Sequence, residues 1–174
     1  MKKITAMLLA SCLMLLASAC GDGNGDNGGG PTANGQPARE TFYFAPDGLK
    51  IAINAEPAPV LAALGEALDQ FDSESCAVDA KDTTYRFQGF ELTVTCPARG
   101  ADYITGIRLL DDSFTTPGGV RIGSEAAEIF AAYGTDYRLN NNEYTFTRGL
   151  SILKIMVSAD GLVSQIIYSY DWDA

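Results

Sequence analysis

The sequence predicts an α+β fold: two tandem units, each a helix packed on an antiparallel meander, form a two-layer α/β sandwich with helices on one sheet face. Three observations support this prediction: a segment that occurs twice, a glycine that ends each copy, and alternating strands after each copy. The copies, residues 53–65 and 122–134, align without gaps. They share Ile53 with Ile122, Glu56 with Glu125, Ala58 with Ala127, Ala62 with Ala131, Ala63 with Ala132 and Gly65 with Gly134. An internal repeat of this kind indicates one structural unit used twice.

Each copy is expected to form a short helix with a marked start. Pro57 and Pro59 suit the first turn of the first helix, where the N–H that proline lacks is not needed. In the second copy, Ser124 is the expected N-cap. Glu125 and Glu128 follow in the first turn, where the helix dipole favours negative charge.

Both helices are expected to end at glycine, because Gly65 and Gly134 can adopt a left-handed conformation without a Cβ penalty. Apolar residues before each glycine fall on one stripe: Val60, Leu61 and Leu64 in the first copy, and Ile129, Phe130 and Tyr133 in the second. A helix of about three turns is marginal alone in water, so each stripe must dock on a sheet.

Alternating apolar residues predict the strands of that sheet. A first hairpin is expected over residues 41–53, around the turn at 46–48. Strands then flank Gln88-Gly89 and Arg148-Gly149, and final strands follow at 104–109 and 163–168. The face of the run 150–157 is ambiguous, and a β-bulge would reconcile its competing apolar residues. The two units span about residues 41–112 and 113–174 of a single globular domain at 40–174.

Residues 1–19 are typical of a bacterial lipoprotein signal peptide, with two lysines, a short apolar run and small residues before Cys20. The ending resembles a lipobox with Ala17 where leucine is usual, which implies cleavage before Cys20 and lipidation of its thiol by acyl chains such as palmitate. Cys12 fits the same pattern but would leave a very short signal, and an ordinary secretory peptide is the other alternative. The protein is therefore expected to be extracytoplasmic and lipid-anchored to the bacterial cell membrane.

Residues 20–39 contain almost nothing apolar and are expected to form a disordered Gly/Asn/Asp-rich tether. Asp22, Asn24 and Asp26 resemble the start of a calcium loop. Asn27 and Ala33 replace the glycine and glutamate that such a loop needs, so no metal is expected there. The chain has 12 basic and 22 acidic residues, and this acidic balance disfavours nucleic acid as a partner.

The cysteines that remain after processing are Cys76 and Cys96, and in an oxidising compartment they are predicted to form a disulfide. Two free thiols are the alternative, because the sequence does not give the Cβ geometry that a bridge requires.

The sequence predicts no catalytic residues, metal site or cofactor. It contains 0 histidines, which excludes Ser-His-Asp and Cys-His catalysis and the zinc motifs that use histidine. Acidic residues such as Asp111 and Asp112, and those around Cys76, are interpreted as a solvated surface; a carboxylate-only enzyme is the weaker alternative.

One side of the predicted sheet offers a candidate binding surface. If the apolar residues of the strands face the helices, polar residues face the other way, since an antiparallel sheet can leave one side wet. The predicted binding residues on this open face are Arg86, Glu91, Thr93, Thr95, Thr145 and Thr147. The aromatic ending, Tyr170 and Trp172, would either face a partner or close the core.

The unit Ile122-Gly123-Ser124, Ile129-Phe130, Tyr133-Gly134, followed by a meander and used twice, resembles the tandem repeat of the β-lactamase inhibitor proteins. It is more distantly similar to small outer-membrane lipoproteins of the BamE (SmpA/OmlA) type, and to uncharacterised tandem-unit lipoproteins of Gram-positive gut bacteria. The resemblance covers about residues 41–172, and Cys76 and Cys96 match the disulfide of the inhibitors' first unit. It implies binding through the open sheet face, but no individual contact residue matches.

The functional expectation is therefore a membrane-tethered, non-catalytic module that binds another envelope or secreted protein or acts as an envelope scaffold. An inhibitor of a secreted or envelope enzyme is the alternative. An inhibitor should carry an aromatic or hydrophobic cluster on the open face, and an enzyme should show a pocket with convergent carboxylates.

Overall fold

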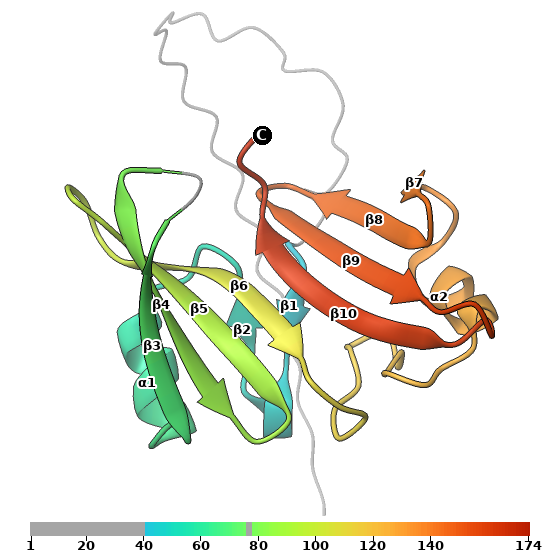
Figure 1. The fold of residues 1–174 in the computed structure, drawn as a ribbon, viewed down its shortest axis with the longest axis horizontal. Coiled ribbons are helices and arrows are strands. Elements are labelled where there is room, and N and C mark those ends of the chain that lie inside the picture. The colour runs from blue at the N-terminus through green and yellow to red at the C-terminus, as the bar shows by residue number, and fades with distance from the viewer. Residues whose placement is uncertain (1–40, 76–77) are drawn as a thin grey trace, which may run out of the picture. The chain divides into compact units, whose positions relative to one another are not determined.

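The computed structural model describes residues 41–75 and 78–174 (Figure 1). The predicted signal peptide, the lipidated Cys20 and the tether lie outside the described residues, as does Cys76. Among the residues that the structure describes, no helix is both long and apolar enough to cross a bilayer.

A small hairpin opens the described chain. Strand β1 (Tyr43–Phe44) pairs with β2 (Ile51–Ala52) around the 3-10 turn Pro46–Gly48, as the sequence predicts. Helix α1 (Pro57–Leu64) follows. Four strands come next, namely β3 (Asp69–Glu74), β4 (Ala80–Phe87), β5 (Phe90–Pro97) and β6 (Tyr103–Leu109).

The second half of the chain begins with helix α2 (Ala126–Tyr133). Its strands are β7 (Arg138–Asn140), β8 (Glu143–Arg148), β9 (Ser151–Val157) and β10 (Val163–Tyr170).

Strands β3 to β10 form one antiparallel sheet in the order β3-β4-β5-β6-β10-β9-β8-β7. The two halves of the chain meet where β6 pairs with β10, with Ile107 opposite Tyr168 and Leu109 opposite Ile166. All four side chains are buried. Backbone hydrogen bonds and a shared core therefore join the two halves.

The core lies on one side of this sheet. It combines apolar strand residues such as Leu92, Ile107 and Leu153 with Phe44 and Ile51 of the hairpin. Each helix adds little: Val60 of α1 and Ile129 of α2 are their members of the buried cluster. In Figure 1, α1 lies behind β3 and β4.

The predicted fold class is wrong. Instead of an α+β sandwich of two helix-plus-meander units, the described chain is mostly β, with one continuous eight-stranded antiparallel sheet and two helices of 8 residues each. The physical reason is that the strands supply most of the buried apolar side chains. The β6–β10 pairing then merges strands that the sequence assigns to separate units.

The helix ends differ from the prediction in detail. Glu125, rather than Ser124, is the N-cap of α2, and its N–H donates to Glu128 Oε1 at 3.0 Å in a capping box. The Ser124 hydroxyl donates instead to Glu128 Oε2 at 3.1 Å. Gly65 and Gly134 end the helices with φ of 79° each, but with ψ of −153° and −163°, far from the left-handed helical value.

The strand predictions miss two elements and misplace a bulge. Strands β3 and β7, at the two ends of the sheet order, have no apolar alternation that would predict them. Strand β9 alternates regularly, with Leu153 and Ile155 in the core. The register shifts instead lie opposite Thr93 and Val94, where Thr105 of β6 is the extra residue, and near Gln165 of β10.

Candidate functional site

The candidate site is the side of the eight-stranded sheet that faces away from the core. Successive strand residues point to opposite faces, and residues directly opposite each other on neighbouring antiparallel strands share a face. Because Phe90 and Leu92 of β5 and Leu109 of β6 point into the core, the residues that alternate with them along each strand point to the other side. We keep the name open face for this side.

One row of opposed residues, the charged row, crosses the open face over all eight strands. Its members, from β3 to β7, are Asp69, Arg86, Glu91, Arg108, Ile167, Lys154, Thr145 and Arg138. Opposite charges alternate over the first four strands. The row contains three of the predicted binding residues: Arg86 and Glu91, which face each other in one hairpin, and Thr145, which is distant in the sequence.

A second row, the small row, runs beside the first. Its members are Phe71, Thr84, Thr93, Gly106, Ser169, Ile152 and Thr147. Two more predicted residues, Thr93 and Thr147, belong to it. A Cβ on Gly106 would approach the Cβ of Thr93 to 3.3 Å, so the middle of this row holds only small side chains.

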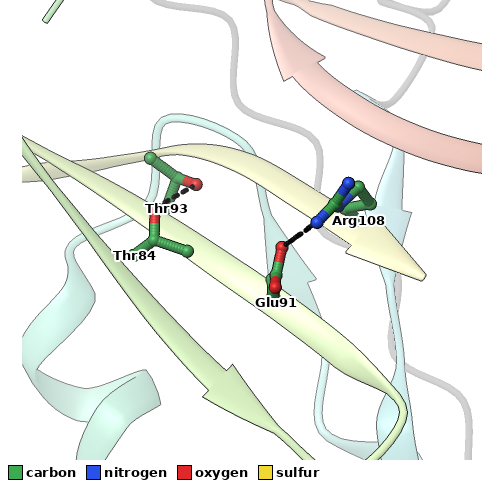
Figure 2. Close-up of polar contacts among 4 residues, drawn as sticks. All are labelled: Thr84, Glu91, Thr93 and Arg108. Atoms are coloured by element: carbon green, nitrogen blue, oxygen red, sulfur yellow. Dashed lines mark hydrogen bonds and ion pairs between the residues drawn. The ribbon is translucent and has the colours of Figure 1, made fainter. Parts of the chain in front are cut away.

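Ion pairs order the charged row. Arg108 donates to Glu91 Oε2 through Nη2 at 2.7 Å and through Nε at 3.0 Å (Figure 2). The Nζ of Lys154 lies 3.7 Å from Oε1 of Glu143, which is on the open face beside the charged row. Exposed pairs of this kind contribute about 0.2–1 kcal/mol, so they position the side chains more than they stabilise the fold.

The threonines of the open face differ in accessibility. Thr84 and Thr93 are 3.3 Å apart at their hydroxyls, which face each other across β4 and β5 (Figure 2). Thr95 is fully buried: its hydroxyl donates to Asp82 Oδ1 at 2.6 Å and lies 2.9 Å from the Thr105 hydroxyl. The Thr95 hydroxyl, which the sequence predicts to contact a partner, is therefore already engaged by the extra residue Thr105.

The open face is hollowed at the β7–β8 end. Thr145, Thr147 and Ile152 line this hollow, together with Arg138, Asp171 and Asp173. Asp171 and Asp173 follow the last strand, and no local pattern predicts that they lie beside Thr145 and Thr147. The described residues contain no group of three or more acidic, cysteine or histidine side chains that could hold a metal ion.

Three carboxylates have a lowered pKa, which is the opposite of what general-acid chemistry requires. The hydroxyl of Thr83 lowers the pKa of Asp72, and Ser113 lowers the pKa of Asp111. The Ser158 hydroxyl lowers the pKa of Asp160. A carboxyl group that donates a proton near neutral pH needs a raised pKa instead. These three residues are therefore ordinary ionised carboxylates.

The predicted disulfide is not found. Cys96, on β5, carries a free thiol, and its predicted partner Cys76 lies outside the described residues. Burial, with the nearby charge of Asp102, raises the pKa of the Cys96 thiol. A thiol with a raised pKa is a poor nucleophile, so Cys96 has the properties of a structural residue.

The aromatic ending of the chain forms a cluster near the start of β6. Tyr170 and Trp172 have ring centroids 4.8 Å apart, and Tyr103 lies 5.7 Å from Tyr170. Tyr170 packs against the core, whereas Trp172 is exposed. The middle of the open face, from Glu91 and Arg108 to the small row, lacks the aromatic cluster expected of an inhibitor.

No protein-family model and no curated protein matches this chain. Among solved structures, it is similar to a cysteine-rich secretory protein from Staphylococcus aureus subsp. aureus Mu50, with a TM-score of 0.49 and 10% identity over 68% of this chain. It is also similar to an extracellular protein containing an SCP domain from Bacillus anthracis str. Ames, with a TM-score of 0.40 and 12% identity over 69% of this chain. The chain spans 44% of the length of each structure.

The structure corrects the resemblance drawn from the sequence, because the described chain forms one continuous eight-stranded antiparallel sheet and not two helix-plus-meander units. The two similar solved structures are described as a cysteine-rich secretory protein and a protein containing an SCP domain, and neither is described as a β-lactamase inhibitor protein or a lipoprotein of the BamE type. The short repeat specifies two helices and their glycines but not the number or order of the strands, so it is not specific for that family.

Proposed function

We propose that this protein is a non-catalytic, extracytoplasmic binding module. In this proposal it is held at the bacterial membrane by a lipid on Cys20 and recognises another envelope or secreted protein through the open face. The observation that carries the proposal is the pair of rows, which places five predicted binding residues on one continuous surface.

The chemistry of the surface favours a protein partner. Alternating charges such as Arg86, Glu91 and Arg108 provide orientation and specificity to a partner with the complementary pattern. A broad sheet surface with small side chains at its centre allows close approach over many residues, as protein interfaces require. The buried helix residues Val60 and Ile129 belong to the core cluster on the other side, so the helices leave the rows accessible.

Site-specific photo-crosslinking in living cells tests this proposal. A photoreactive amino acid placed at Arg86 or at Thr147, both exposed, should trap the same protein from two distant strands. The matched control is Ala131, an exposed position on α2 outside the open face. Adducts of equal yield from Ala131, or no adduct from either open-face position, would contradict the proposal.

Charge reversal separates the face from general electrostatics. Arg86→Glu should abolish the adduct formed at Thr147, because it replaces an alternating pattern by three neighbouring negative charges in the charged row. Arg121→Glu makes the same change in net charge at an exposed position before α2 and should leave that adduct intact.

A further inference from the structure

Strand β3 forms a free edge of the eight-stranded sheet, since β4 is its only neighbour in the strand order of the described chain. All six of its residues, from Asp69 to Glu74, are exposed. An edge strand presents unpaired backbone groups, onto which another extended chain can add. In Figure 1, β3 lies at the edge of the sheet next to β4.

The register identifies the backbone groups that are available. Ser75 donates from its N–H to the carbonyl of Ala80 at 2.9 Å, which makes these two residues a hydrogen-bonded pair. Hydrogen-bonded and non-bonded pairs alternate along an antiparallel ladder. Gln70, Asp72 and Glu74 therefore belong to non-bonded pairs, and their N–H and C=O groups point away from β4. The Gln70 N–H donates to Asp69 Oδ1 at 2.9 Å, so the N–H groups open to another strand are those of Asp72 and Glu74.

The side chains of β3 divide between two faces: Asp72 and Glu74 lie on one, and Phe71 lies on the other, the open face, together with Asp69. Phe71 is 57% exposed and Leu68, just before the strand, is 69% exposed. Asp72 lies 3.5 Å from Lys81 in an exposed pair, and Asp69 and Glu74 form no ion pair with another described residue.

These features determine which chain can add to the edge. A second copy of this protein would bring the same carboxylates opposite Asp72 and Glu74, and like charges across a strand pair are destabilising. A partner residue paired with Gln70, Asp72 or Glu74 points its side chain to their face, where lysine or arginine is favoured. The partner residues between these positions point to the opposite face, where an apolar side chain beside Phe71 is favoured.

We propose that β3 is a docking edge for an extended segment of another protein in which basic and apolar residues alternate. The segment adds to the sheet as a further strand through the backbone N–H and C=O groups of Asp72 and Glu74 and through the carbonyl of Gln70. This surface is the edge of the sheet and does not depend on partner binding at the open face.

A peptide that alternates lysine and valine over eight residues is the probe for this edge. Fluorescence anisotropy with the full chain in detergent should show binding, and hydrogen exchange should slow in the segment 69–75. A peptide with the same sequence but with alternate backbone nitrogens methylated should bind about tenfold more weakly, because it cannot complete the ladder. Equal binding of the methylated peptide would show simple attraction to an acidic surface and overturn the proposal.

Two variants of one residue test the backbone contribution. Asp72→Pro removes an outward N–H without removing a bond to β4, and it should bind the peptide about tenfold more weakly than Asp72→Ala. Asp72→Ala loses the same carboxylate but keeps the N–H, so equal binding by the two variants would contradict the proposal. A thermal melt confirms that both variants fold, and if the proline variant does not, the methylated peptide still decides the question. Thr147→Arg, on the open face, should leave peptide binding unchanged, so the two proposals fail separately.

Discussion

Two buried tyrosines near the junction of the two halves, Tyr133 of α2 and Tyr168 of β10, have hydroxyl groups that influence each other but form no hydrogen bond of good geometry with a described residue. Burial raises the pKa of both, and strongly so for Tyr168, whose pKa Tyr133 raises further. A buried hydroxyl that finds no partner costs about 1–3 kcal/mol. These two groups therefore limit the stability of the fold, in contrast to buried hydroxyls such as that of Ser151, which accepts from the Phe42 N–H at 2.8 Å.

Tyr168→Phe is expected to leave stability at neutral pH unchanged or to raise it by about 1 kcal/mol, because it removes an unsatisfied hydroxyl. The pKa of Tyr168 is higher in the folded than in the unfolded state, so the stability linked to it is present below about pH 10 and is lost as pH rises further. The variant should therefore lose less stability above pH 10. Urea denaturation at neutral and alkaline pH measures both effects, with Tyr144→Phe as the control; identical alkaline losses in the two variants would contradict the assignment.

At the scale of single elements, the glycines that end the helices follow the sequence in position but not in conformation. Gly65 and Gly134 combine a positive φ with an extended ψ, a region open essentially to glycine alone. A left-handed cap, which the sequence predicts, would also tolerate asparagine. The difference between the two conformations can therefore be measured.

Gly134→Ala and Gly134→Asn are both expected to lower the free energy of unfolding by about 1–3 kcal/mol, since neither residue adopts this backbone conformation without strain. Urea denaturation of the two variants gives the comparison. If asparagine costs much less than alanine, then α2 ends in the left-handed conformation and the extended one is wrong.

The edge strand β3 is an element that local sequence does not predict. Its residues Asp69, Gln70 and Asp72 have low strand propensity, and their pattern predicts a loop. The neighbouring strand β4 nevertheless pairs with all of β3 in register. Tertiary pairing overrides local propensity here, and it produces the free edge on which the second proposal rests.

At the scale of the whole molecule, the β6–β10 pairing joins both halves of the described chain in one sheet over one core. The open face is continuous across this junction, where Arg108 lies opposite Ile167 and Gly106 opposite Ser169. A partner can therefore contact residues from both halves at once, which two separate units would not allow.

The proposed lipid anchor determines where this surface operates. Cys20→Ala should release the protein from the membrane fraction, because acyl chains contribute about 0.8 kcal/mol per buried CH₂ group to membrane binding. Cys12→Ala, the matched control at the alternative cysteine, should remain membrane-bound. Cell fractionation with mass spectrometry of the N-terminus measures the outcome; release by Cys12→Ala instead would assign the lipid to the other cysteine.

The local features of this protein follow from its sequence alone. Alternating apolar residues located the long strands β4, β5, β9 and β10, glycines marked the ends of both helices and prolines marked the start of α1, because these signals depend on neighbouring residues alone. The polar side of the strands also followed from alternation, so five accessible residues of the open face could be named in advance.

Only the tertiary structure decided how these elements combine. The order of the strands, the β6–β10 junction and the pairing of β3 depend on contacts between residues far apart in the chain, which periodicity does not specify. For the same reason, alternation put Thr95 on the open face but could not foresee the bulge residue Thr105 that engages its hydroxyl. The fold class, the free edge at β3 and the burial of Thr95 beneath the open face all follow from those long-range pairings.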